Sequence, residues 1–277
     1  MSHRLLSLLS RVALPVTSAA LLLACDPEPE PGTDAGMTDD TGGTVEDTGG
    51  TVDDTGTAPS CVEHEALCQD ESIGMLMLQS SASAGAITEE GTAAGEFTSH
   101  IDATAGGFGA PPQSFVYARF TETGLEVVRI DDETALESND WDIAFRRFVM
   151  RLNSGVSGPG CVEAGRTGPG TTFDALTTVP GDVAFFAEEY FSGDSCEFIV
   201  DATGMGPQTV LSSYFAYASC LSMTGNVYIV ALGDGRHVKL QVLSYYTPAA
   251  QDACDSTGTA PMPSGSGNMR VRWAFVD

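Results

Sequence analysis

The chain has 277 residues, of which 38 are acidic and 12 basic, so its formal net charge at pH 7 is −26. This excess of negative charge repels nucleic-acid phosphates and anionic lipid headgroups, so the composition excludes nucleic acid as a partner and argues against membrane adsorption by charge. Residues 61–277 are numerous enough to form one sizeable hydrophobic core.

The first 24 residues have the pattern of a bacterial signal peptide. Arg4 and Arg11 flank the start of an apolar run over residues 12–23, and Leu-Leu-Ala then leads into Cys25. The run is too short for a stable membrane-spanning helix. Its ending resembles the lipobox of bacterial lipoproteins, so we expect acylation of Cys25 and a lipid anchor that holds the protein on a membrane. The alternative is an ordinary signal peptide followed by an unrelated cysteine.

Residues 25–60 are predicted to be a disordered acidic tether. Residues 26–60 include ten acidic and no basic residues, and a seven-residue unit, D-T-G-G-T-V-E/D, occurs twice in succession. Such a segment buries too little apolar surface to offset its chain entropy. Together with the anchor it predicts a protein of the bacterial cell envelope, at the outer membrane or cell surface, with the inner membrane as the alternative.

Six cysteines in residues 61–277 predict three disulfides, because the number is even and the chain is exported. We expect one pair to close a non-helical N-terminal segment. A zinc site is the alternative, which the absence of C-x₂₋₄-C spacing disfavours. The expected pairs are Cys61 with Cys68, Cys196 with Cys220, and Cys161 with Cys254.

Short apolar segments separated by turn residues predict an all-β domain over residues 61–277, with mostly antiparallel sheets and little helix. Residues 121–124 and 233–235 are the expected turns of two hairpins. A helix is expected only around residues 63–78. The expected strands are 96–103, 115–120, 125–130, 183–190, 196–200, 214–217, 227–232, 238–245 and 269–276.

Residues 141–152 are expected to form the strand on which the domain is organised. Apolar residues alternate with others along this segment, but the parity of the alternation changes near its middle. A β-bulge near Arg146 and Arg147 would absorb the extra residue and bend the strand around the core. These two arginines and Arg151 are interpreted as solvated or salt-bridged, with an anion-binding cluster as the alternative.

Several motifs of this sequence occur together in one known family. In chain order they are W-D-I-A-F-R-R-F at 141–148, R-L-N-S-G-V-S-G-P-G at 151–160, T-T-V-P at 177–180 and the G-D-G hairpin at 227–246. In these motifs the sequence resembles the HmuY family of bacterial haem-binding lipoproteins, from about Thr98 to the C-terminus. The resemblance implies an all-β fold, a lipid anchor, and capture of haem for uptake through an outer-membrane receptor.

The resemblance also indicates where haem iron would be ligated. In haem-binding relatives, two His or Met side chains come from the segment between the T-T-V-P motif and the last hairpin. Here residues 181–226 contain no histidine but hold Met205 and Met223, which are therefore possible axial ligands. The alternative is that both methionines fill gaps or lie exposed. The domain's histidines are interpreted as surface residues: His64, His100 and His237.

No enzymatic activity is expected, because the sequence has no G-x-S-x-G, H-E-x-x-H or phosphate-binding loop. Two functions from different classes follow. The first is an envelope-anchored lipoprotein that binds haem without catalysis. The second is a disulfide-braced HmuY-like surface lipoprotein that does not bind haem and acts as a binding or interaction module for another ligand.

Overall fold

The computed structural model describes residues 61–277 apart from residues 63, 94 and 106–110. The predicted signal peptide (1–24), Cys25 and the predicted tether (25–60) lie outside these residues. Over the part that is described, no helix has the length and apolarity needed to cross a membrane.

The helices are α1 (Gln69–Met75), α2 (Asp132–Ala135), η1 (Gly193–Ser195), η2 (Ser212–Tyr214) and α3 (Pro248–Thr257). The strands are β1 (Ile87–Ala93), β2 (Glu96–Asp102), β3 (Val116–Thr121), β4 (Gly124–Val128), β5 (Ile143–Arg146), β6 (Val149–Leu152), β7 (Glu163–Arg166), β8 (Phe191–Ser192), β9 (Glu197–Phe198), β10 (Phe215–Tyr217), β11 (Leu221–Met223), β12 (Val227–Ala231), β13 (His237–Ser244) and β14 (Asn268–Val276).

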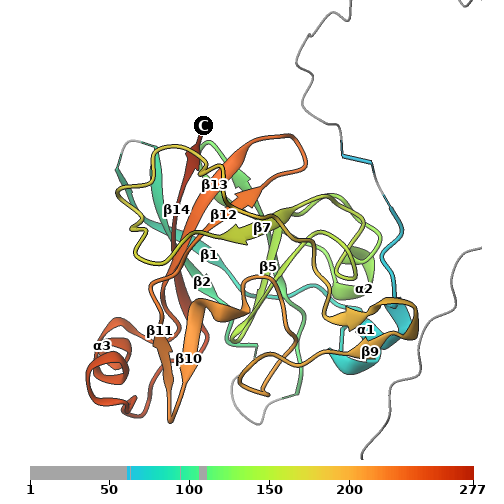
Figure 1. The fold of residues 1–277 in the computed structure, drawn as a ribbon. Coiled ribbons are helices and arrows are strands. Elements are labelled where there is room, and N and C mark those ends of the chain that lie inside the picture. Colours follow the sequence, from blue (N-terminus) through green and yellow to red (C-terminus); the bar gives the residue numbers. More distant parts are fainter. Residues whose placement is uncertain (1–60, 63, 94, 106–110) are drawn as a thin grey trace, which may run out of the picture. The chain divides into compact units, whose positions relative to one another are not determined.

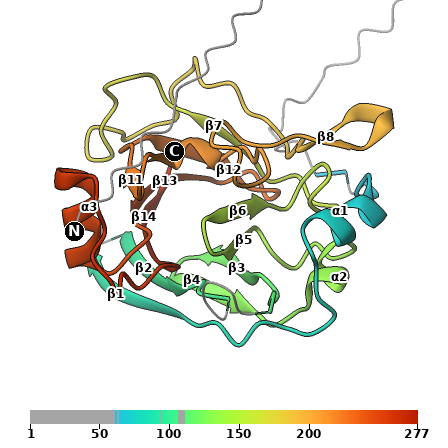
Figure 2. The same ribbon diagram turned by 90° about the horizontal axis from the view of Figure 1, so that it is seen from below.

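Two antiparallel sheets form the body of the domain (Figure 1). Within the described residues, one sheet has the strand order β1-β2-β14-β13-β12-β7 and the other β4-β3-β5-β6. Figure 2 shows the longer sheet curving so that β1 comes to lie beside β4. The carboxylate of Glu89 joins the two sheets there, because its Oε1 accepts hydrogen bonds from Leu125 N (2.7 Å) and Ser99 Oγ (2.8 Å). The all-β prediction is confirmed.

The core consists of clusters that are each organised around large aromatic residues, which dominate burial energetics. The largest lies between the sheets and contains Trp273, whose ring stacks on Phe97 with centroids 4.4 Å apart. Its indole Nε1 donates to Ser99 Oγ at 2.8 Å. A second cluster contains Trp141, whose Nε1 donates to Ala135 O at 3.0 Å, and it packs α1 and α2 against the shorter sheet.

Most of the expected strands are present, and one is not. β3 and β4 form the predicted hairpin, with Thr121 opposite Gly124, and β12 and β13 pair around the Gly-Asp-Gly turn. The predicted strand over residues 183–190 is wrong: this segment makes one isolated bridge, between Phe186 and Ala164. It meets the outer edge of β7 at this one bridge and contributes to a small cluster through Val183 and Phe185 instead of pairing along its length.

The expectation that helix is confined to residues 63–78 is also wrong, although α1 lies inside that range. α3 begins with Pro248 at its first turn and ends at Gly258, which adopts a left-handed conformation with φ 74°. Proline at the start and glycine just past the end are ordinary helix boundaries. Gln251 is buried on this helix, and its Oε1 accepts from Tyr245 N at 2.9 Å.

Residues 141–152 form a hairpin and not one bulged strand. β5 pairs antiparallel with β6, and Arg146 lies opposite Val149, so Arg147 and Phe148 are the turn. The change of parity in the sequence marks this chain reversal. The turn is hidden from sequence inspection because Arg147, with φ 51°, occupies a left-handed position that glycine usually fills. Both strands are largely buried, as expected for the central segment.

All six cysteines of the domain form disulfides, so the predicted number is confirmed, but every predicted pair is wrong. The bridges are Cys61–Cys161, Cys68–Cys196 and Cys220–Cys254, with Cα atoms 5.6, 5.6 and 6.0 Å apart. Two bridges tie the N-terminal segment to distant parts of the domain, and the third ties β11 to α3. Cys61 and Cys68 are not partners, because the N-terminal segment packs across the domain and brings them to Cys161 and Cys196 respectively.

Candidate functional site

A cleft of ≈ 540 Å³ opens beside the β5–β6 turn. Its walls come from the end of α1, from this turn, and from β9 with the loop that follows it. Their side chains are mostly apolar, as is usual for small-molecule sites. The wall residues include Met75, Met77, Arg147, Phe148, Phe198 and Met205.

Large apolar side chains stay exposed at the rim of this cleft. Met75 is 54%, Met77 57% and Val200 52% exposed, and all three line the cleft. Exposed apolar side chains that line one cleft indicate a binding surface. Methionine is common at such surfaces because its flexible, polarizable side chain adapts to a ligand.

Unusual backbone conformations gather around the same cleft. Among the described residues, five non-glycine residues have positive φ, and three of them line the cleft: Met77 (φ 48°), Ala105 (φ 47°) and Arg147 (φ 51°). The other two, Cys68 and Cys196, form the disulfide beside it. Left-handed conformations are costly for such residues and persist where surrounding structure enforces them, often at binding sites.

Arg146 holds the α1 wall of the cleft in place. Its guanidinium donates to Leu76 O and to Met77 O (3.4 Å), and it lies 3.8 Å from the carboxylate of Asp132. Its charged group lies over the Phe115 ring, 4.2 Å from the centroid. Burial lowers the pKa of Arg146 to about 10, so it is still charged at neutral pH. The salt-bridge interpretation therefore applies to this arginine.

Arg147 provides a charge to the cleft that lacks a carboxylate partner among the described residues. Its Nη1 is buried without a hydrogen-bond partner, and its backbone N donates to Ala103 O at 2.7 Å, which fixes the turn against the end of β2. Burial raises the pKa of Tyr245, and the nearby Arg147 guanidinium offsets part of this rise. A buried N–H without a partner is costly, so it favours a ligand that brings an acceptor.

Arg151 differs from both neighbours, and the expectation that it is solvated or salt-bridged is wrong. It is fully buried behind the cleft, where its Nη2 donates to Tyr117 Oη at 2.6 Å. Its guanidinium lies 4.2 Å from the centroid of the Phe115 ring, on which Arg146 also packs. Tyr117 in turn donates to Asp132 Oδ1 at 2.8 Å, and burial raises the pKa of Tyr117 well above its ordinary value. This network supports the cleft but does not line it.

The two methionines that the resemblance indicated lie in different places. Met205 lines the cleft from a loop in which its backbone N donates to Asp201 Oδ1 at 3.2 Å. Met223 is in β11, opposite Phe215, and is not one of the residues that line the cleft. Met75 and Met77 line it instead, and sequence reasoning missed them because they precede the region of family resemblance. The histidines are no closer to the cleft: His64 is exposed, His100 and His237 are half-buried, and none lines it.

Glu188 anchors the loop that carries Met205 to the β5–β6 hairpin. Its Oε1 accepts from Leu152 N (3.0 Å) and its Oε2 from Val210 N (3.1 Å). The close approach of its backbone requires Gly155, whose φ is 56° and where a Cβ would collide with Glu188 O. Burial raises the pKa of Glu188 to about 7, because the hydrogen bonds only partly offset the loss of solvation.

The raised pKa predicts a specific pH dependence of stability. The folded protein binds the Glu188 proton more tightly than the unfolded chain, so the contribution is complete below about pH 4.5 and is lost as the pH rises through about 7. We expect Glu188 to lower the free energy of unfolding by roughly 3 kcal/mol across this interval. Urea titrations at several pH values should show this slope in the native protein and a flatter one in Glu188→Gln. The exposed neighbour provides the control: Glu189→Gln should keep the native slope, and equal slopes in all three proteins would contradict the prediction.

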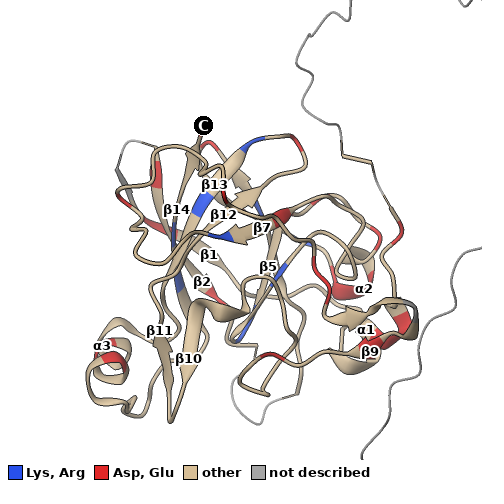
Figure 3. Ribbon diagram, viewed as in Figure 1, with Lys and Arg blue, Asp and Glu red and all other residues tan. Residues whose placement is uncertain are grey.

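A second, polar cleft of ≈ 620 Å³ lies at the other end of β3. Three of its charged residues form ion pairs, because Arg236 contacts Glu122 at 3.0 Å and Asp234 at 2.7 Å. Arg119, Glu126 and Asp142 also line it and form no ion pair with the described residues. Figure 3 shows acidic segments on α1 and α2 and basic ones on β5, so charge is mixed around the apolar cleft as well. The polar cleft differs from the apolar one in its rim, because its large apolar residues, such as Phe120, Trp141 and Leu232, are buried.

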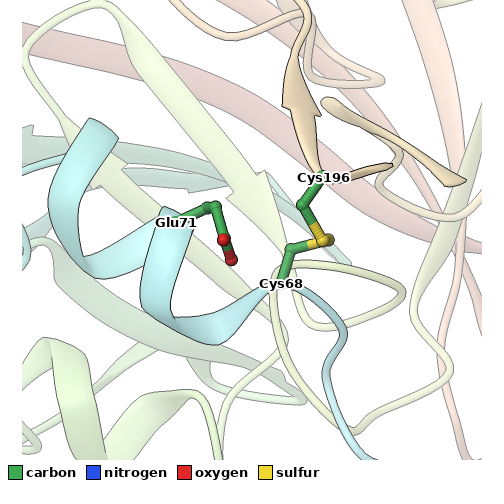
Figure 4. Close-up of side chains that lie close together, drawn as sticks. All are labelled: Cys68, Glu71 and Cys196. Carbon is green, nitrogen blue, oxygen red and sulfur yellow. A yellow bond between two sulfur atoms is a disulfide. The ribbon is translucent and has the colours of Figure 1, made fainter. Parts of the chain in front are cut away.

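Glu71 lies close to the Cys68–Cys196 bridge (Figure 4), with one ligand atom of each residue within 4.8 Å of the others. Two cysteines and a carboxylate would suit a metal ion if the sulfurs were thiolates. Both sulfurs are bound to each other in the structure. The group therefore acts here as a covalent link and not as a metal centre.

Comparison with known proteins gives the family. A model described as HmuY protein matches residues 112–256, which is more than half of the chain. No curated protein matches this chain. Among solved structures, a candidate HmuY-like haem-binding protein of Bacteroides vulgatus is 18% identical, with a TM-score of 0.42 over 65% of this chain and 92% of that one. The HmuY analogue TFO of Tannerella forsythia is 17% identical, with a TM-score of 0.32 over 72% of this chain and 98% of that one. Because the family model covers more than half of its length, the chain belongs to the HmuY family.

Proposed function

We propose that this protein binds haem, without catalysis, in the apolar cleft beside the β5–β6 turn. The observation that carries the proposal is the convergence of three methionines, Met75, Met77 and Met205, on one cleft with exposed apolar walls. Thioether sulfur is a competent axial ligand for haem iron. The family supports the choice of haem over other flat apolar ligands, and the candidate HmuY-like relative of B. vulgatus is named for haem binding.

The residues of the cleft suit both parts of such a ligand. Haem has a flat apolar ring, which Phe148 and Phe198 would contact, and carboxylates that need a cationic partner. Arg147 offers a buried N–H that has no partner among the described residues. When bound, the iron supplies the coordination chemistry, and the chain's part is to exclude water from it and to hold the ring. Met205 is the first ligand in this proposal, with Met75 or Met77 as the second in place of Met223.

The location is part of the same proposal. Acylation of Cys25 after removal of residues 1–24 would place the domain on the bacterial envelope, with residues 25–60 as its tether. From the outer membrane or cell surface, such a protein would pass haem to an uptake receptor. Palmitate labelling of the native chain and of Cys25→Ser would test the anchor independently of haem.

Absorbance titration with ferric and ferrous haem tests the binding function. We expect saturable binding with a shifted Soret band, and loss of that shift or weakening of affinity by about tenfold or more in Met205→Ala and Arg147→Ala. Met75→Ala and Met77→Ala identify the second ligand. If neither changes the Soret band and Met223→Ala does, the ligands are Met205 and Met223, the pair that the family resemblance indicates. Met262→Ala is the control, because Met262 is 85% exposed and does not line the cleft. A folded protein with no Soret shift would contradict the proposal.

The alternative function is binding of another partner through the same surface. The exposed rim of Met75, Met77 and Val200 favours it as well, because exposed apolar patches also mark protein interfaces. The alternative requires that the cleft bind no haem in either oxidation state. The titration therefore separates the two functions directly.

A further inference from the structure

The Cys68–Cys196 disulfide joins two walls of the apolar cleft. Cys68 is the N-cap of α1, and Met75 at the other end of this short helix lines the cleft. Cys196 immediately precedes β9, in which Phe198 lines the cleft from the other segment. Figure 4 shows the bridge between the start of α1 and the start of β9. The bond therefore fixes how far these two walls can separate.

We propose that this disulfide is a redox-controlled latch on the cleft: a dithiol reductant opens it, the β9 wall loosens, and bound ligand leaves faster. The identity of the ligand rests on the proposed function, whereas the loosening of the wall does not. Both cysteines are half-buried, so a small dithiol can reach them, whereas Cys220 and Cys254 are only 4% and 1% exposed. Reduction should therefore spare the Cys220–Cys254 bridge.

The two walls are not held equally well without the bond. The α1 wall has other attachments: Leu76 and Leu78 are in the core, and Arg146 donates to the carbonyl groups of Leu76 and Met77. The β8–β9 hairpin has fewer attachments: Phe191 is in the same cluster and Phe198 packs against it, but the two strands have only two residues each around the exposed turn at η1. Opening the bond is therefore expected to release the β9 side, where Phe198 lies.

The backbone at both cysteines favours release once the bond is open. Cys68 has φ 56° and Cys196 φ 49°, in the left-handed region that non-glycine residues rarely adopt. The bond fixes these conformations in two segments that are 128 residues apart in sequence. After cleavage each residue can relax without the other, so the closed arrangement loses its constraint.

The reaction is ordinary thiol–disulfide exchange. A thiolate of the reductant attacks one sulfur and displaces the other cysteine as thiolate, which takes up a proton. The second thiol of the reductant then displaces the remaining cysteine and closes its own disulfide, so two electrons pass from the dithiol to the protein. The carboxylate of Glu71, close to both sulfurs, repels the attacking and the leaving thiolate and so slows the opening.

The latch is tested on the full chain with dithiothreitol, with alkylation and peptide mapping to identify the opened bond. Hydrogen exchange is followed at Ile199, which donates to Tyr190 O, and at Gln208, which donates to Ile199 O. Opening Cys68–Cys196 should speed exchange at both amides and raise the rate of haem transfer to apomyoglobin by about tenfold. Glu71→Gln should be reduced several-fold faster than the native protein.

The matched control is the double variant Cys61→Ser/Cys161→Ser, because that bridge is also half-buried and closes a loop of similar length but lies at the polar cleft. It is compared with Cys68→Ser/Cys196→Ser. If the latter fails to fold, dithiothreitol is applied to Cys61→Ser/Cys161→Ser, in which Cys68–Cys196 is the one half-buried bridge that remains. Unchanged exchange at Ile199 and Gln208 after opening would overturn the latch. Faster hydrogen exchange in a protein that binds neither ferric nor ferrous haem would support the latch and refute the proposed ligand.

Discussion

Replacing Asp132 by alanine is expected to lower the free energy of unfolding by about 3–5 kcal/mol, the range for breaking a buried charge network. Asp132 is fully buried, and its Oδ1 accepts from Phe115 N and from Tyr117 Oη, both at 2.8 Å. Its Oδ2 accepts from Gln79 N at 3.0 Å and faces Arg146 at 3.8 Å. Alanine would leave these donors unsatisfied and the arginine without its counter-charge.

The preceding residue provides the control for this prediction. Asp131 is the N-cap of α2, where its Oδ1 accepts from Thr134 N at 2.9 Å, and this hydrogen bond lowers the pKa of Asp131. Asp131→Ala should cost about 1 kcal/mol, as is usual for an N-cap. Urea unfolding of both variants measures the difference. Equal losses of unfolding free energy would contradict the prediction, because Asp132 would then contribute no more to stability than the N-cap Asp131.

Removing the Cys61–Cys161 bridge should have an effect of similar size. It closes a loop of 100 residues, for which the chain-entropy estimate is a loss of about 4–5 kcal/mol, since the unfolded chain regains freedom when the bond is gone. The Cys220–Cys254 bridge closes only 34 residues, so the same estimate is about 1 kcal/mol smaller. Double serine variants of each pair, unfolded in urea, test this order.

The two bridges also differ in how much packing they would disrupt. Cys220 and Cys254 are both in the main core, so their substitution adds a packing loss to the entropic one. A larger loss for the Cys220–Cys254 variant would show that burial, and not loop length, sets the contribution of these bonds.

The sequence predicted the parts of the fold that depend on local patterns. The hairpins around residues 121–124 and 233–235 are present because a glycine-containing turn lies between two alternating segments. The β5–β6 turn was missed because Arg147 occupies a left-handed position without being glycine. α3 was missed because its buried face includes the polar Gln251, which interrupts the apolar pattern expected of a helix. Gln251 is buried where it accepts a hydrogen bond from Tyr245 N.

The disulfide pairs and the buried arginine depend on contacts that spacing does not encode. Cys61 and Cys161 are brought together by the packing of the N-terminal segment across the domain, and 100 residues separate them. Arg151 reads as an outward residue of a strand, yet Tyr117 and Phe115 enclose it. Each depends on which side chains meet in three dimensions, and a single sequence does not give that information.

The candidate site shows the same division. Met205 lies in the segment that the family resemblance indicated and does line the cleft. Met75 is the last residue of α1 and Met77 follows it. Core packing of Leu76 and Leu78, the disulfide at Cys68 and the hydrogen bonds of Arg146 hold this segment beside the cleft. The three walls are neighbours in the folded domain but come from separate parts of the sequence.

The placement of the two tryptophans gives the domain a separate optical reporter in each of its principal core clusters. Trp273 is surrounded by Phe97 and Phe120, whereas Trp141 is edge-on to Tyr117 near the Arg151 guanidinium. A nearby cation shifts and quenches indole emission differently from an aromatic stack. Trp141→Phe and Trp273→Phe would therefore let fluorescence follow the melting of one cluster at a time, and reveal whether both melt in a single cooperative step.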